Sequence, residues 1–118
     1  MLPGAYRMRR REEFTVGVRR GQRAGRPNLV MHVSHEGSAE EPPRIGFVVS
    51  KAVGNAVVRN RVQRRLRHLM AERVHRLPYG SLVVIRAHRR AAGARYVELG
   101  SDLDKALGRL VDHRAGKR

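Results

Sequence analysis

The sequence predicts a single α/β domain, because segments with helical periodicity alternate with short segments rich in β-favouring residues. The chain has 118 residues, which is the size of one compact domain and leaves no room for a second core. Hydrophobic residues make up 41% of the chain, enough for that one core. We therefore expect one domain over residues 1–118.

The first helix is predicted from Arg10 to about Arg20. Phe14 and Val18 stand four residues apart, which places them on one helical face, and Gly21 marks the end.

Two strands are predicted after this helix, over residues 28–34 and 45–50, from their content of β-favouring residues. Residues 36–43 between them are rich in Glu, Gly, Ser and Pro, the composition of an exposed loop. A β-hairpin is the simplest link between two such strands. We therefore expect the two strands to be neighbours in the sheet.

The longest predicted helix covers residues 56–77. Gly54 and Asn55 precede it as a turn and an N-cap, and Pro78 and Gly80 end it. Apolar residues recur at helical spacing and predict one buried stripe. The stripe consists of Val58, Val62, Leu66, Leu69, Met70 and Leu77.

The end of the chain predicts a strand and a last helix. Residues 82–85 form a short apolar run, typical of a strand buried on both faces or in the middle of a sheet. Asp102 and Asp104 stand near the start of the helix and Arg114 near its end, as the helix dipole favours. Its apolar positions are Leu99, Leu103, Leu107 and Leu110. Residues 114–118 are expected to form a frayed tail.

The charge of the chain predicts a polyanionic partner. Lys and Arg number 26 against 10 Asp and Glu, a formal net charge of +16 at pH 7. Such an excess weakens the compact state and is typical of proteins that bind phosphates or anionic membranes. No apolar run approaches the ~20 residues that cross a bilayer, and the first residues lack the apolar stretch of a signal peptide. We therefore expect a cytoplasmic protein that binds nucleic acid.

Basic residues are concentrated on the central helix and just before it. No acidic residue stands between Glu41 and Glu72, and most bases in that interval are arginine, whose guanidinium can hold a phosphate bidentately. The bases are Arg44, Lys51, Arg59, Arg61, Arg64, Arg65 and Arg67. The positions roughly opposite the apolar stripe are Arg61, Arg64, Arg65 and His68. A solvated face usually mixes Glu with Lys, so this pattern favours a face that binds phosphates.

The first turn of this helix combines two features that favour an anion. Arg59 and Asn60 lie there beside the free backbone N–H groups and the positive end of the helix dipole. Asn60 can hold a ribose or a phosphate, and a local capping or turn role fits its spacing equally well.

The run from Phe47 to Arg67, FVVSKAVGNAVVRNRVQRRLR, closely resembles the signature of the bacterial ribonuclease P protein subunit, roughly S-K-K-V-G-N-A-V-x-R-N-R-x-K-R-x-x-R. The likeness spans nearly the whole chain. Ala52 and Gln63 stand where that family has lysine, so two phosphate contacts are missing there or are supplied elsewhere.

The resemblance implies an α/β (α+β) two-layer sandwich, in which a sheet of about four strands packs against helices in the order α-β-β-β-α-β-α. It also implies a left-handed βαβ crossover through the arginine-rich helix. The protein would bind the catalytic RNA and the 5′ leader of precursor tRNA, with no catalytic residue and no metal of its own. The RNA subunit, with its bound Mg²⁺, would perform the hydrolysis.

The resemblance assigns residues to two binding roles. Contacts with the catalytic RNA fall to Lys51, Arg59, Asn60, Arg61, Arg64, Arg65 and Arg67. A leader groove on the sheet would be lined or flanked by Phe14, Val18, His32, Val48 and Ser50, with Lys51 beside them. Phe14 is equally explained as a core residue. Because aromatic residues are scarce, we expect the groove to bind its single strand weakly and with little regard to sequence.

Other functions fit the sequence less well. A ribosomal or RNA-chaperone protein without a role in tRNA processing would share the charge, but it would not require the long signature. A DNA-binding regulator would need two helices joined by a short turn, whereas the arginine-rich helix follows a strand. A self-sufficient nuclease would need clustered Asp, Glu or His, and Ser50 has no His and carboxylate placed to activate it.

Overall fold

The computed structural model describes residues 2–8 and 10–112, which contain three α-helices and four strands. The predicted tail 114–118 and the predicted helix end at Arg114 lie outside these residues. The helices are α1 (Arg11–Arg20), α2 (Ala56–Ala71) and α3 (Tyr96–Leu107). The strands are β1 (Gln22–Gly25), β2 (Leu29–Ser34), β3 (Arg44–Val48) and β4 (Leu82–Ala87). Their order along the chain is the α-β-β-β-α-β-α order that the resemblance implies.

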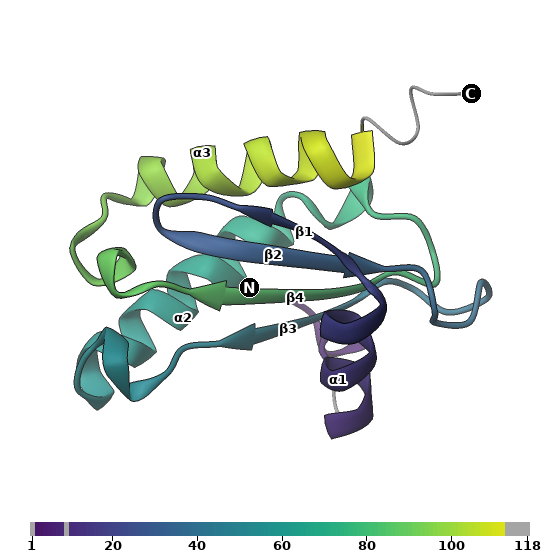
Figure 1. The fold of residues 1–118 in the computed structure, drawn as a ribbon, viewed down its shortest axis with the longest axis horizontal. Helices are drawn as coiled ribbons and strands as arrows, with labels where there is room; N and C mark the ends of the chain where they lie inside the picture. The colour runs from purple at the N-terminus through teal and green to yellow at the C-terminus, as the bar shows by residue number, and fades with distance from the viewer. Residues whose placement is uncertain (1, 9, 113–118) are drawn as a thin grey trace.

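The four strands form one mixed sheet in the spatial order β1-β2-β4-β3 (Figure 1). β1 pairs with β2, and β2 with β4, in antiparallel fashion, while β3 and β4 are parallel. β4 has a neighbour on each side, and residues 82–85 are all buried. The prediction of a strand in the middle of a sheet is confirmed for this segment.

The predicted hairpin between the second and third strands is wrong, because β4 lies between β2 and β3. Met31 of β2 pairs with Ile85 of β4, and Ile85 pairs in turn with Phe47 of β3. The hairpin partner of β2 is β1, which the sequence did not reveal. β1 has four residues, of which only Ala24 is buried, so it carries almost no hydrophobic pattern.

The connection from β3 to β4 is the left-handed βαβ crossover that the resemblance implies. In Figure 1 both strands point to the left, β4 lies above β3, and α2 runs back behind the sheet. With the strands turned to point upward, the chain moves to the right behind the sheet, which is the left-handed sense. This sense is rare among βαβ units.

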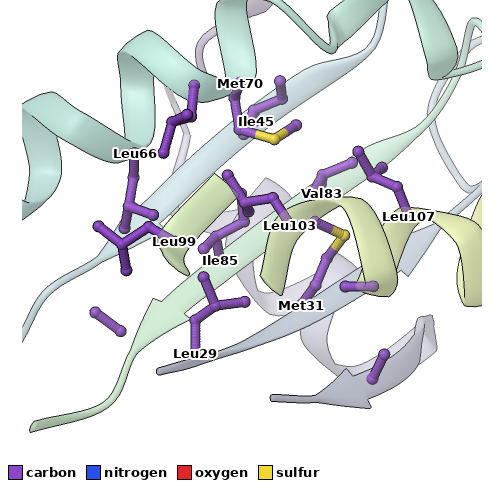
Figure 2. Packing of buried hydrophobic residues seen from close by; sticks show 14 of the residues in the cluster. Leu29, Met31, Ile45, Leu66, Met70, Val83, Ile85, Leu99, Leu103 and Leu107 are labelled. Atoms are coloured by element: carbon purple, nitrogen blue, oxygen red, sulfur yellow. The ribbon is translucent and has the colours of Figure 1, made fainter. Parts of the chain in front are cut away.

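Helices pack on both faces of the sheet. α2 and α3 cover one face, where Leu66, Met70, Leu99, Leu103 and Leu107 meet strand residues of alternate positions (Figure 2). The strand residues of this core include Leu29, Met31, Ile45, Val83 and Ile85. α1 covers part of the other face, where the backbone of Gly17 lies against Val84. Burying each large core side chain stabilises the fold by about 1.5–3 kcal/mol.

The central helix is shorter than predicted. α2 ends at Ala71, and a 3-10 turn over Val74–Arg76 follows before Leu77 becomes extended. Leu77 is still buried, so its apolar spacing reflects the core rather than a continuous helix. Arg73 and Arg76 turn instead toward Asp104 of α3, at 2.8 and 2.9 Å. An ion pair with a neighbouring helix is invisible to helical periodicity.

Candidate nucleic-acid interface

The N-terminus of α2 is built by an N-cap at Asn55. Its side-chain oxygen accepts a hydrogen bond from the backbone N–H of Val58 at 3.0 Å, as predicted. Because Asn55 fills the capping role, the side chain of Asn60 is not needed for it and is exposed in the first turns of the helix. Asn60 is the fifth residue of α2, however, and the backbone N–H of Arg59 already donates to the carbonyl of Asn55 at 2.9 Å, so the prediction that both residues lie beside free N–H groups in the first turn is wrong. What Asn60 offers a ligand is its exposed side-chain amide.

The arginines of α2 do not form one uniform solvent face. Arg64 is exposed, whereas Arg61 and Arg65 are half-buried against the 3-10 segment η4 (Arg89–Gly93) and the residues after it. Arg61 Nη2 donates to the carbonyl of Ala92 at 3.0 Å, and Arg65 Nη1 donates to that of Ala94 at 3.4 Å. The expectation that these two arginines face solvent with Arg64 is thus corrected, since a helical wheel takes no account of the neighbouring segment.

No carboxylate relieves the charge of this helix within the part of the chain that the structure describes. The ion pairs found there involve other bases, such as Arg73 and Arg76 with Asp104, and Arg44 with Glu41. The predicted RNA-binding bases without a carboxylate within 4.0 Å are Lys51, Arg59, Arg61, Arg64, Arg65 and Arg67. Unpaired arginine at this density is unfavourable for an isolated protein and suits a polyphosphate partner.

Tertiary structure extends this basic surface beyond the predicted residues. Lys51 begins the 3-10 turn η2 (Lys51–Val53), which packs beside η4 and α2. η4 adds the exposed side chains of Arg89 and Arg90, and Arg95 follows just before α3. The sequence analysis did not single out these three arginines, although the run His88-Arg89-Arg90 was a usable signal. We call the side chains of η2, α2 and η4 together the α2–η4 surface.

The predicted groove residues lie on the sheet face that α1 covers. His32 pairs with Val84, and Val84 with Gly46, so these three share one row across the sheet. The next row on that face contains Val30, Arg86 and Val48. Phe14 reaches this face from α1, where its ring lies against Gly46, and it is half-buried, which is compatible with both a core and a groove role.

The remaining predicted groove residues lie at the margins of this face. Val18 is 37% exposed on α1, one turn beyond Phe14. Ser50 is exposed just beyond the end of β3, and Lys51 follows it at the start of η2. Ser50 therefore stands between the sheet face and the α2–η4 surface, to which Lys51 belongs.

Two arginines that sequence reasoning missed make this sheet face positive. Arg23 pairs with His32 across β1 and β2, and Arg86 lies one row away on β4. Burial, followed by the charges of Arg23 and Arg86, lowers the pKa of His32 below its ordinary value. Arg86 breaks the apolar run of β4, and that break was the signal in the sequence that it faces outward.

The described residues supply no grouping of three or more His, Cys, Asp or Glu side chains that could hold a metal ion. Nor does any described helix have the length and apolar character needed to span a membrane.

Comparisons with known proteins identify the family of this chain. The family model for ribonuclease P matches residues 2–111. The "Ribonuclease P protein component" of Streptomyces avermitilis is 57% identical, over 94% of this chain and 96% of that protein. The protein of the same name from Thermobifida fusca is 53% identical, over 91% of this chain and 77% of that protein.

Solved structures show the same fold. The ribonuclease P protein of Staphylococcus aureus superposes with a TM-score of 0.75 at 22% identity, covering 86% of this chain and 92% of that one. That of Thermotoga maritima gives 0.71 at 20% identity, covering 84% and 92%. The fold, the family model over almost all of the described residues and the relatives above 50% identity together show that this chain belongs to the ribonuclease P protein family.

Proposed function

We propose that this chain, as the protein subunit of ribonuclease P, binds the catalytic RNA through its α2–η4 surface and the 5′ leader of precursor tRNA through the sheet face under α1. The observation that carries the proposal is the set of six bases on η2 and α2 without a carboxylate partner among the described residues. A folded polynucleotide neutralises such a surface, with release of its counterions.

The residues predicted to bind the catalytic RNA divide into two groups, those with exposed side chains and those whose side chains also bond to the protein backbone. Arg64 and Asn60 are exposed and contact RNA directly. Arg61 and Arg65 contribute charge while they also hold η4 through the carbonyls of Ala92 and Ala94. The lysines missing at Ala52 and Gln63 are offset by Arg89 and Arg90, which lie on the same surface.

The leader role falls to Phe14, Val18, His32, Val48 and Ser50. We add Arg23 and Arg86, because they lie on the same sheet face. Backbone phosphates of a single strand contact the two arginines, and the apolar side chains contact the bases. Phe14 is the only Phe, Tyr or Trp among the predicted groove residues, and His32 adds an imidazole ring. The affinity for the leader therefore comes mainly from charge and varies little with sequence.

Hydrolysis belongs to the RNA subunit and its Mg²⁺, and the protein supplies binding and orientation. By binding the leader, the protein raises the affinity for the precursor and orients it for cleavage at the junction between leader and mature tRNA. Such a ribonucleoprotein works in the cytoplasm, where its precursor tRNA is made.

Reconstitution tests this function. The purified chain is mixed with its cognate ribonuclease P RNA, and cleavage of a precursor tRNA is followed at low Mg²⁺ with and without the protein. We expect the chain to accelerate removal of the leader under these conditions. An RNA-chaperone role alone would instead give the same stimulation with an unrelated basic RNA-binding protein, and that result would contradict the proposal.

A further inference from the structure

We propose that Tyr96 and His68 form a stacking ledge for an unpaired nucleotide of the catalytic RNA, beside the arginines of α2. The ledge rests on the proposed function and deepens it, because it adds a stacked base to a surface whose other proposed contacts come from basic side chains and Asn60. Neither residue is among the predicted RNA-binding or leader-groove residues.

The ledge joins two rings from different helices. Tyr96 is the first residue of α3 and is 40% exposed, and His68 is exposed in the last turns of α2. Their ring centroids lie 6.3 Å apart, with the ring planes tilted by 59°. The chain has only two Phe, three Tyr and no Trp, so few aromatic side chains are available to bind bases. Exposed rings of this kind are the usual platform for a splayed-out RNA base.

The position of Tyr96 is fixed by two arginines of α2 that bind the segment just before it in the chain. Arg61 and Arg65 hold the carbonyls of Ala92 and Ala94, a few residues before Tyr96. Glu98 then accepts a hydrogen bond from the backbone N–H of Arg95 at 2.8 Å, which closes the first turn of α3. The ring is therefore presented on a rigid support, and little conformational entropy is lost when a base stacks on it.

Positive charge surrounds the ledge on the side that faces α2 and η4. Arg64 precedes His68 by four residues on α2, which places the two side chains next to each other on one helical face. Arg90 and Arg95 are exposed on the segment that leads into α3. In Figure 1 this green segment lies beside α2, at the left of the molecule. A nucleotide stacked on Tyr96 thus finds guanidinium groups for its own phosphates.

Tyr79 provides a matched comparison. It is 61% exposed in the turn before β4, so it is more accessible than Tyr96. Tyr96 has a ring partner and a basic neighbourhood, whereas Tyr79 has no ring contact within the described part of the chain. We therefore place the stacking site at Tyr96 because of its ring partner and basic neighbours, and not because of its exposure.

The test measures the affinity of the full-length chain for its cognate ribonuclease P RNA over a series of salt concentrations. We expect Tyr96→Ala to weaken binding roughly 5- to 150-fold, the range for loss of one stacked base, without changing the slope of log K against log salt. Tyr96→Phe keeps the ring and should bind within about twofold of the unmodified chain. Tyr79→Ala should have no effect. His68→Ala, on an exposed helical position, should weaken binding in the same direction as Tyr96→Ala.

The control for the proposed function is Arg64→Ala, which should lower both the affinity and the salt slope. If Tyr96→Ala and His68→Ala bind normally while Arg64→Ala is weakened, the ledge is wrong and the proposed function stands. If Arg64→Ala also binds normally, the α2–η4 surface itself is wrong. A loss confined to precursor tRNA without the catalytic RNA would overturn the choice of partner. Chemical probing completes the test: Tyr96→Ala should expose an unpaired nucleotide of the catalytic RNA that the unmodified chain protects, and an identical protection pattern would count against the ledge.

Discussion

The ring of Phe14 occupies the space in which a side chain at position 46 would lie. A Cβ placed on Gly46 would come within 2.4 Å of both Cε1 and Cζ of Phe14. The contact joins α1 to β3, and it determines how closely the ring of Phe14 packs on the sheet. The absence of a side chain at Gly46 is therefore a structural requirement of this face.

Gly46→Ala tests that requirement. We expect it to displace Phe14, to lower the free energy of unfolding by about 1–3 kcal/mol, the usual cost of overpacking, and to reduce the affinity for precursor tRNA. Gly25→Ala in β1 is the control, since a Cβ there meets nothing within 4 Å. Thermal unfolding and binding to precursor and mature tRNA measure the two effects. Equal losses for both tRNAs would argue against a leader contact at Phe14.

Arg61 and Arg64 should differ in what they contribute. Arg61→Ala removes the bond to the carbonyl of Ala92, so it should lower the free energy of unfolding by about 1 kcal/mol and also weaken RNA binding. Arg64→Ala should leave stability unchanged and reduce the salt slope of RNA binding by about 0.7–0.9. Urea denaturation and binding at several salt concentrations separate the two. Equal stability of both variants would show that the Arg61 bond is not stabilising.

His32 should make stability depend on pH in a defined direction. Because its pKa is lowered in the folded state, the unfolded chain takes up the proton first as the pH falls. The free energy of unfolding should therefore be highest above pH ~6.5 and decrease as the pH falls below that value. His32→Gln should flatten this decrease. A stability profile identical to that of the unmodified chain would contradict the assignment.

The same histidine should report on leader binding. Phosphates that neutralise Arg23 and Arg86 remove part of the repulsion that lowers the pKa of His32. An NMR titration of the histidine should therefore show a higher pKa in the presence of a single-stranded RNA oligonucleotide than in its absence. An unchanged pKa at saturation would place the oligonucleotide elsewhere.

Asp102 should be among the most costly charged residues to replace, because it is buried and makes several contacts. Its carboxylate accepts hydrogen bonds from the backbone N–H and from Nδ2 of Asn28, both at 3.0 Å, and pairs with Arg26. Asp102→Ala leaves these donors buried without an acceptor, at a cost of about 3 kcal/mol. Thermal or urea unfolding measures the loss, and a change below about 1 kcal/mol would contradict this account.

Asp104 provides the exposed counterpart. Its hydrogen bond with Arg73, and the charges of Arg73 and Arg76, lower the pKa of its carboxyl. The pair therefore stabilises the fold above the unfolded pKa of about 3.9 and loses this effect as the pH falls through the folded pKa. Asp104 is about half exposed, so screening keeps the effect of Asp104→Asn below about 1 kcal/mol at pH 7. The difference between the two proteins should vanish in acid; a difference that persisted there would point to a steric cause.

Much of this molecule could be predicted from local sequence. The spacing of Val62, Leu66 and Met70 determines which face of α2 is buried, and Asn55 determines where that helix begins. The segment 82–85 was predicted to be a central strand because an unbroken apolar run has no polar face that could be exposed to solvent. The arginine-rich run in the same region also carried the resemblance to the family, which the comparisons confirm.

Tertiary structure decided how these elements meet. Local pattern could not place β4 between β2 and β3, because the partners of β4 stand 48 to 58 positions away in β2 and 38 positions away in β3. The hairpin expected from proximity was therefore wrong. It could not separate Arg64 from Arg61 and Arg65, since only the packing of η4 against α2 turns two of these side chains toward backbone carbonyls. Nor could it bring Tyr96 to His68, or Arg23 and Arg86 to His32. Charge and periodicity are properties of neighbouring residues in the chain, whereas a binding surface is a property of segments that folding brings together.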